Sequence, residues 1–176
     1  MCWGISSKWG DGLYELEKNR NDLMLSLLQL EDLLDINEEL RLESLRDPRI
    51  EYSGANDYEV KISNLKKLIE YTPKRDILEI AAYYLKNIII LQAFPDGNHR
   101  TALYAVELLL EINGYKFDYA PEEAYEFRKE LYNKRLQEYK TYEERPISVL
   151  KEENNQVFSF CLEFVKSHVI HLTQSH

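Results

Sequence analysis

Two apolar stretches, residues 77–91 and 102–110, constrain the fold of this chain more than any other feature. The first reads ILEIAAYYLKNIIIL and the second reads ALYAVELLL. A helix that is apolar on nearly every side is stable only when other elements surround it. The sequence therefore predicts an all-α domain built around two neighbouring core helices.

The rest of the chain provides further helices that can enclose this pair. Apolar residues recur at helical spacing, and we expect helices over residues 13–34, 60–71, 72–92, 98–112, 156–172 and from 121 onwards. In the third of these, Thr72 is expected as the N-cap and Pro73 as the first helical residue. Residues 46–58 break the pattern with turn-forming residues and allow a short strand at 50–52. A second short strand is possible at 116–118. The prediction is one domain over 1–176 with about six or seven helices.

Composition and charge exclude several classes of protein. The 176 residues are 44% hydrophobic and 30% charged, as in a soluble globular domain. A formal net charge of -9 argues against a nucleic-acid partner. The longest apolar runs fall far short of the ~18 residues of a membrane span, and the N-terminus has no signal-peptide pattern. Cys2 and Cys161 lack metal-ligand spacing, so we expect a cytoplasmic protein with Cys161 in the core.

The loop between the two core helices carries more polar chemistry than a turn requires. It contains Asp96, Gly97, Asn98, His99 and Arg100 in a row. The first amides of a helix have no intrahelical partner, so a helix starting here offers an anion site, with Asn98 as a favoured N-cap. Arg100 can grip a phosphate, and Asp96 can hold Mg²⁺ beside it. The plainer interpretation is a turn, a cap and a surface arginine.

The spacing of these residues favours the first interpretation. Phe94-x-Asp96-Gly97-Asn98-x-Arg100 resembles the Fic/Doc (Fido) signature His-x-Phe-x-Asp/Glu-Gly-Asn-Gly/Lys-Arg and matches five of its seven defined positions. Thr101 and Ala102, which follow the arginine, are similar to the Doc branch. The second arginine that is frequent in the AMP-transferring branch is replaced by Leu103. The resemblance extends over about residues 12–140, with further C-terminal helices over 141–176.

The resemblance implies a helical domain that transfers AMP or phosphate from ATP or another nucleoside triphosphate to a hydroxyl of a target protein. Asp96 would hold Mg²⁺, Arg100 would act in catalysis together with residue 92, and residues 46–58 would form a β-hairpin flap that aligns the target. The nucleotide site would comprise Phe94, Asp96, Gly97, Asn98, His99, Arg100 and Thr101. A small antitoxin partner is expected, because the nearest inhibitory motif, Ser148 to Asn154, does not fit the family's pattern.

One departure from the signature bears directly on activity. The family's histidine, which takes the proton from the target hydroxyl, is replaced by Gln92. A glutamine amide can position a hydroxyl but cannot act as a base. His99 stands where the family has Gly or Lys, on the phosphate side of the loop, and is not expected to replace that base.

Three explanations of Gln92 stay open: a natural loss, a variant that works without a base, or an inactivating change. The sequence thus predicts a weak or inactive Fic/Doc-like transferase. The alternatives are a nucleotide-binding pseudoenzyme and a helical protein-interaction domain.

Overall fold

A computed structural model describes residues 25–47, 49–53, 59–139, 147–151 and 155–172. Within these ranges the chain forms six α-helices, one 3₁₀ helix and two short strands. In chain order they are α2 (Leu30–Arg46), α3 (Ile62–Glu70), α4 (Ile77–Leu91), α5 (Asn98–Glu111), β1 (Tyr115–Phe117), α6 (Pro121–Tyr139), η1 (Ile147–Lys151), α7 (Gln156–His168) and β2 (Val169–His171). The predicted all-α class is confirmed.

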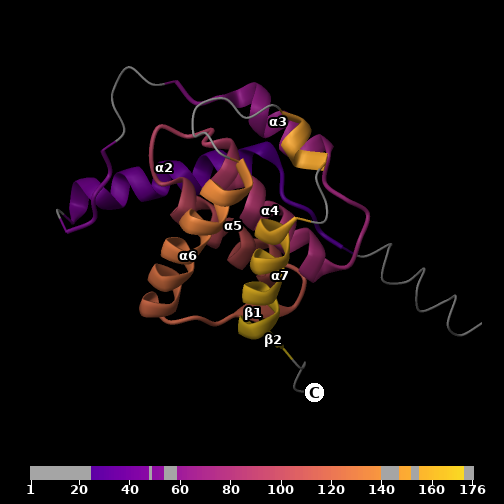
Figure 1. The fold of residues 1–176 in the computed structure, drawn as a ribbon. Helices are drawn as coiled ribbons and strands as arrows, with labels where there is room; N and C mark the ends of the chain where they lie inside the picture. The colour runs from indigo at the N-terminus through magenta and orange to yellow at the C-terminus, as the bar shows by residue number, and fades with distance from the viewer. Residues whose placement is uncertain (1–24, 48, 54–58, 140–146, 152–154, 173–176) are drawn as a thin grey trace, which may run out of the picture.

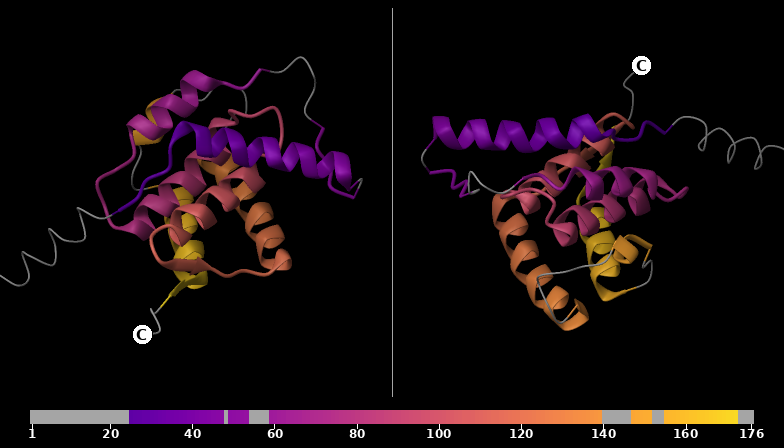
Figure 2. Two further views of the ribbon diagram at one scale, coloured as in Figure 1. Left: turned by 180° about the vertical axis from the view of Figure 1, so that it is seen from behind. Right: turned by 90° about the horizontal axis from the view of Figure 1, so that it is seen from above.

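Helices α4 and α5 form the centre of the molecule, as their apolar sequences predict. Figures 1 and 2 show α2 and α3 on one side of this pair and α6 and α7 on the other. Of the fifteen residues of α4, thirteen are buried, so this helix is enclosed on nearly all sides. Helix α7 packs against α4, while α2 packs against α5, and this places the α4–α5 loop near α2.

The start of α4 differs from the prediction. The N-cap is Asp76, whose carboxylate accepts hydrogen bonds from the amides of Leu78 and Glu79 at 3.0 and 3.1 Å. Thr72 lies before the helix, and its hydroxyl lies 2.8 Å from the hydroxyl of Tyr84. An aspartate is as good an N-cap as threonine, and Asp76 stands directly before the first buried residue of the helix, so it takes the role.

The first helix of the described residues begins later than expected. Residues 25–29 are not helical, and α2 begins at Leu30, where Gln29 and Asp32 form a capping box. The amide of Gln29 donates to the Asp32 carboxylate at 2.6 Å. Leucines recur at helical spacing on both sides of Leu30, so their pattern did not indicate that a helix begins there. Residues 13–24 of the predicted helix lie outside the described residues.

The two short strands follow α5 and α7 and pair with each other. β1 pairs antiparallel with β2, Tyr115 facing His171 and Phe117 facing Val169. The strand expected near 116–118 is therefore confirmed, whereas the helix predicted to reach 172 ends at His168. The expected strand at 50–52 is absent, because residues 49–53 form a turn followed by irregular chain. Among the helices in the described ranges, none combines the length and apolar character needed to cross a membrane.

Candidate functional site

The loop from Gln92 to Gly97 connects α4 to α5 and begins with an unusual backbone conformation. Gln92 is the C-cap of α4 and adopts the left-handed region, with φ 45° and ψ 52°. Its side-chain amide turns back and donates to the carbonyl of Ile89. Gln92 therefore satisfies one of the last carbonyls of α4, which have no partner within the helix.

Asn98 fixes the middle of the loop. Its side-chain oxygen accepts from the amide of Phe94 at 3.0 Å, and its Nδ2 donates to the carbonyl of Phe94 at 2.9 Å. Phe94 itself is buried in the core, so its ring anchors the loop there. The N-cap of α5 is Gly97 and not Asn98, so the asparagine holds the loop from inside the first turn of the helix.

Gly97 is required where the loop approaches α2. It has φ +73°, which disfavours any residue with a side chain. A Cβ built on Gly97 would also lie 3.3 Å from Nδ2 of Asn37 and 3.5 Å from the ring of Tyr52. Asn37 of α2 and Tyr52 of the upstream segment thus leave no free space for a side chain at this position.

Asn37, on α2, is a site residue that the sequence reasoning missed. It is only 5% exposed. Its Nδ2 donates to the carbonyl of Asp96 at 2.9 Å and to the hydroxyl of Thr101 at 2.8 Å. The helix was expected to end at residue 34, so the position of Asn37 on the face that buries Leu33 and Leu40 followed only from the observed extent of α2.

The carboxylate of Asp96 is held by three donors. Oδ2 accepts from the amide and from the hydroxyl of Ser53, and Oδ1 accepts from the amide of Gly97. Burial raises the pKa of this carboxyl, but these hydrogen bonds and the charge of Arg100 outweigh it, and the net pKa is below its usual range. Asp96 is therefore a firmly ionised carboxylate at neutral pH.

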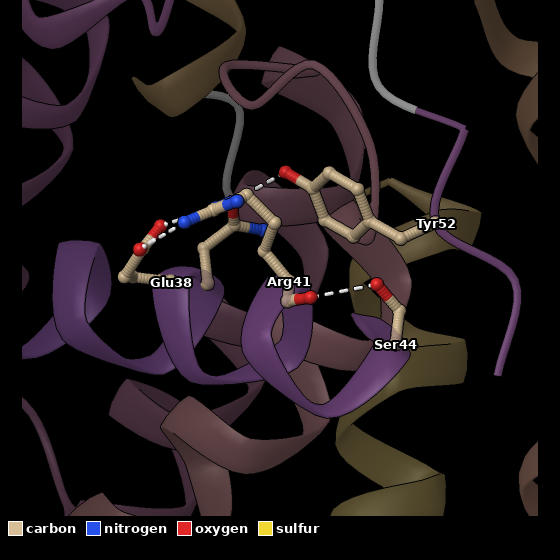
Figure 3. A network of polar contacts seen from close by, with 5 residues as sticks. Glu38, Arg41, Ser44 and Tyr52 are labelled. Atoms are coloured by element: carbon tan, nitrogen blue, oxygen red, sulfur yellow. Dashed lines mark hydrogen bonds and ion pairs between the residues drawn. The ribbon is translucent and has the colours of Figure 1, made fainter. Parts of the chain in front are cut away.

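Arg100 and Tyr52 complete the contacts between segment 49–53 and the loop. Nη2 of Arg100 donates to the carbonyl of Glu51 at 2.6 Å. The hydroxyl of Tyr52 donates to Oδ1 of Asn37 at 3.1 Å. Figure 3 shows Tyr52 reaching toward α2, beside the ion pair of Glu38 and Arg41. Of the flap predicted at 46–58, residues 51–53 lie against the loop as irregular chain, and residues 48 and 54–58 lie outside the described residues.

His99 lies away from this cluster. Its ring is largely buried, and Nδ1 has no hydrogen-bond partner. Burial, with smaller contributions from Arg128 and Arg135 of α6, lowers the pKa of His99 to about 4. The side chain is therefore neutral and faces the α6 side of the molecule. Of the predicted site residues, the structure brings Asp96, Gly97, Asn98, Arg100 and Thr101 together.

Chemically, the loop offers one carboxylate, one guanidinium and the amino end of α5. Over the residues that the structure describes, no group of three or more His, Cys, Asp or Glu side chains forms a metal site. A magnesium ion commonly takes only one or two carboxylates and completes its shell with phosphate oxygens and water. The inhibitory motif considered at 148–154 has its last three residues outside the described part.

Comparison with known protein families gives a match that includes this loop. A family described as Fic/DOC family matches residues 27–110, which include α2, α3, α4, α5 and the connecting loop. Comparison with the curated proteins and with the solved structures gave no match. The matched segment carries the loop, the asparagine that fixes it and the helices on both sides, so residues 27–110 are similar to the Fic/DOC family.

Proposed function

We propose that this protein is a Fic/Doc-like transferase that moves AMP or phosphate from a nucleoside triphosphate to a hydroxyl of a target protein. The observation that carries the proposal is the loop at the start of α5, where Asn98 fixes the backbone and Asp96 and Arg100 stand four residues apart. The match of residues 27–110 to the Fic/DOC family supports the same class of reaction.

The phosphates are proposed to bind at the amino end of α5. The first helical amide with a backbone acceptor in this helix is that of Thr101, which donates to the carbonyl of Gly97 at 2.8 Å. The amides before it are the kind that bind phosphate at helix starts. Arg100 adds a planar guanidinium in the first turn, which suits the oxygens of a phosphate.

A magnesium ion fits the proposed site. The carboxylate of Asp96 is ionised, and its Oδ1 accepts only one of the three hydrogen bonds. With ATP bound, Mg²⁺ held by Asp96 and the phosphates would neutralise negative charge on the transferred group. The lone carboxylate explains why the ion would need the nucleotide's oxygens as well.

Proton removal is the step that this chain is least equipped to perform. In the transfer, the target hydroxyl oxygen forms a bond to phosphorus, the bond to the leaving phosphate group breaks, and the hydroxyl proton must be accepted. Gln92 stands at the position of the family's base and cannot accept a proton. Its left-handed backbone is a conformation in which histidine is several-fold enriched, so a histidine fits this position well.

The transferase activity is therefore proposed to be weak or absent with Gln92 at the position of the base. A nucleotide-binding pseudoenzyme is the second candidate function, and the bond from the Gln92 amide to Ile89 favours it, because that side chain is occupied in capping α4. In either case we expect a cytoplasmic protein and a separate small antitoxin partner.

The experiment is ligand stabilisation, measured as the shift in melting temperature with millimolar Mg·ATP. Mass action stabilises the fold by about 2.7 kcal/mol when ligand is present at 100 times its dissociation constant. Arg100→Ala and Asp96→Ala should each abolish most of the shift, while Lys129→Ala, an exposed cation of α6 paired with Glu126, should retain it. No shift for the wild type would reject nucleotide binding and leave a helical interaction domain.

A further inference from the structure

One short upstream segment occupies both ligand-binding side chains of the loop. The backbone carbonyl of Glu51 accepts from Arg100, and the amide and hydroxyl of Ser53 donate to Asp96. Residues 51–53 therefore contact the anionic and the cationic group of the site at the same time.

Tyr52 fastens this segment between those two contacts. Its hydroxyl donates to Oδ1 of Asn37, and its ring lies 3.5 Å from the position a Cβ would take on Gly97. The same asparagine holds the carbonyl of Asp96 through Nδ2. Asn37 thus connects the upstream segment to the loop through one side chain.

These contacts engage the same two side chains that a magnesium nucleotide would need, Asp96 and Arg100. A carboxylate oxygen has about two acceptor positions, and Oδ2 of Asp96 already takes two hydrogen bonds from Ser53. Nη2 of Arg100 already donates to the carbonyl of Glu51. Full engagement of a ligand by both side chains therefore requires the segment to withdraw.

We propose that residues 51–53 form an inhibitory strap, which competes with Mg·nucleotide for Asp96 and Arg100. This inference rests on the proposed function and describes how that site is regulated. When only the open fraction of molecules binds, the apparent dissociation constant is the intrinsic one divided by that fraction. Loosening the strap should therefore increase nucleotide affinity.

The test is isothermal titration of Mg·ATP into the full chain and three variants. Ser53→Pro removes the amide hydrogen and the hydroxyl that bind Asp96, and we expect it to tighten binding by about tenfold, or about 1.4 kcal/mol. Tyr52→Phe removes only the hydroxyl bond to Asn37 and should tighten binding by a smaller factor. Tyr125→Phe, an exposed tyrosine of α6, should bind like the wild type.

Hydrogen exchange gives a second measurement that needs no variant. Because the Ser53 amide donates to Asp96, it should exchange slowly in the free protein and faster when Mg·ATP is added. If the wild type binds but both strap variants bind equally or more weakly, the segment supports the site and the strap proposal is overturned. If neither the wild type nor Ser53→Pro binds Mg·ATP at millimolar concentration, the proposed function fails together with the strap.

Discussion

Asn98 holds Phe94 by both of its backbone groups, accepting from the amide at 3.0 Å and donating to the carbonyl at 2.9 Å. These two bonds close the loop into a ring before α5 begins. Phe94 is 2% exposed and Asn98 is 6% exposed, so water cannot readily replace either bond. The shape of the candidate site therefore depends on one side-chain amide.

Replacing Asn98 with alanine should lower the free energy of unfolding by about 2–4 kcal/mol, because two buried backbone groups lose their partners. Urea denaturation followed by circular dichroism measures this change. Asn133→Ala, at an exposed position of α6, is the matched control and should change stability by less than about 0.5 kcal/mol. An equally small change at Asn98 would mean that the loop can rearrange to satisfy Phe94.

Two glycines allow backbone strain to be separated from crowding. Gly97 and Gly114 both have positive φ, at +73° and +83°, but only Gly97 has neighbours within 4 Å of a built Cβ. Gly114→Ala should cost about 1–2 kcal/mol for the left-handed conformation alone. Gly97→Ala should cost at least about 1 kcal/mol more, since the methyl group meets Asn37. Equal losses in thermal denaturation would contradict the close approach of α2 to the loop.

Restoring histidine at position 92 should create or raise transfer activity. A positioned base contributes about 10²–10⁴-fold, so that is the gain expected for Gln92→His. The readout is transfer of label from ATP to proteins of a cell lysate, with the wild type tested in parallel. The double variant Gln92→His with Arg100→Ala should lose the gain, because the base acts only on an aligned phosphoryl group.

The same substitution should leave the fold intact. Histidine tolerates the left-handed conformation of residue 92, so the free energy of unfolding should change by less than about 1 kcal/mol. A Gln92→His protein that folds and binds nucleotide but transfers no more label than the wild type would favour the pseudoenzyme.

Stability should fall as the pH is lowered from about 6.5 toward 4, because of His99. The pKa of this buried ring is lowered from 6.5 to about 4 in the folded protein. Between these values the unfolded chain binds the extra proton, so the contribution is complete above pH 6.5 and is lost on acidification, at up to about 1.4 kcal/mol per pH unit.

Urea denaturation at pH 7 and pH 5 tests this dependence. His99→Gln should flatten the difference between the two pH values, whereas His171→Gln, at an exposed position of β2, should preserve most of it. An unchanged pH dependence in His99→Gln would assign the acid sensitivity to other groups.

The central helices were predictable because their burial follows from composition alone. An apolar stretch such as 77–91 has no alternative to the core, and its structure is the predicted one. Boundaries were less certain where two caps compete, as with Thr72 and Asp76, or where leucines continue past a helix start, as before Leu30.

The candidate site was predictable only along its own loop. The motif located Asp96 and Arg100. Their partners Ser53 and Glu51 lie 43 and 49 residues away in the sequence, and no local pattern predicts contacts over that separation. The inward direction of His99 was likewise hidden, since it depends on how α6 packs. Asn37 was missed for a different reason, because the helix that carries it was expected to end at residue 34 and runs to Arg46.

The packing of α4 against α7 limits which fragments of this protein can fold on their own. The family match ends at residue 110, yet α7 begins at Gln156 and covers one side of the central helix. Its inward residues include Val157, Cys161 and Val165, each fully buried. A recombinant fragment limited to 27–110 would present that side of α4 to water and aggregate. The recognisable family segment is therefore smaller than the unit that folds.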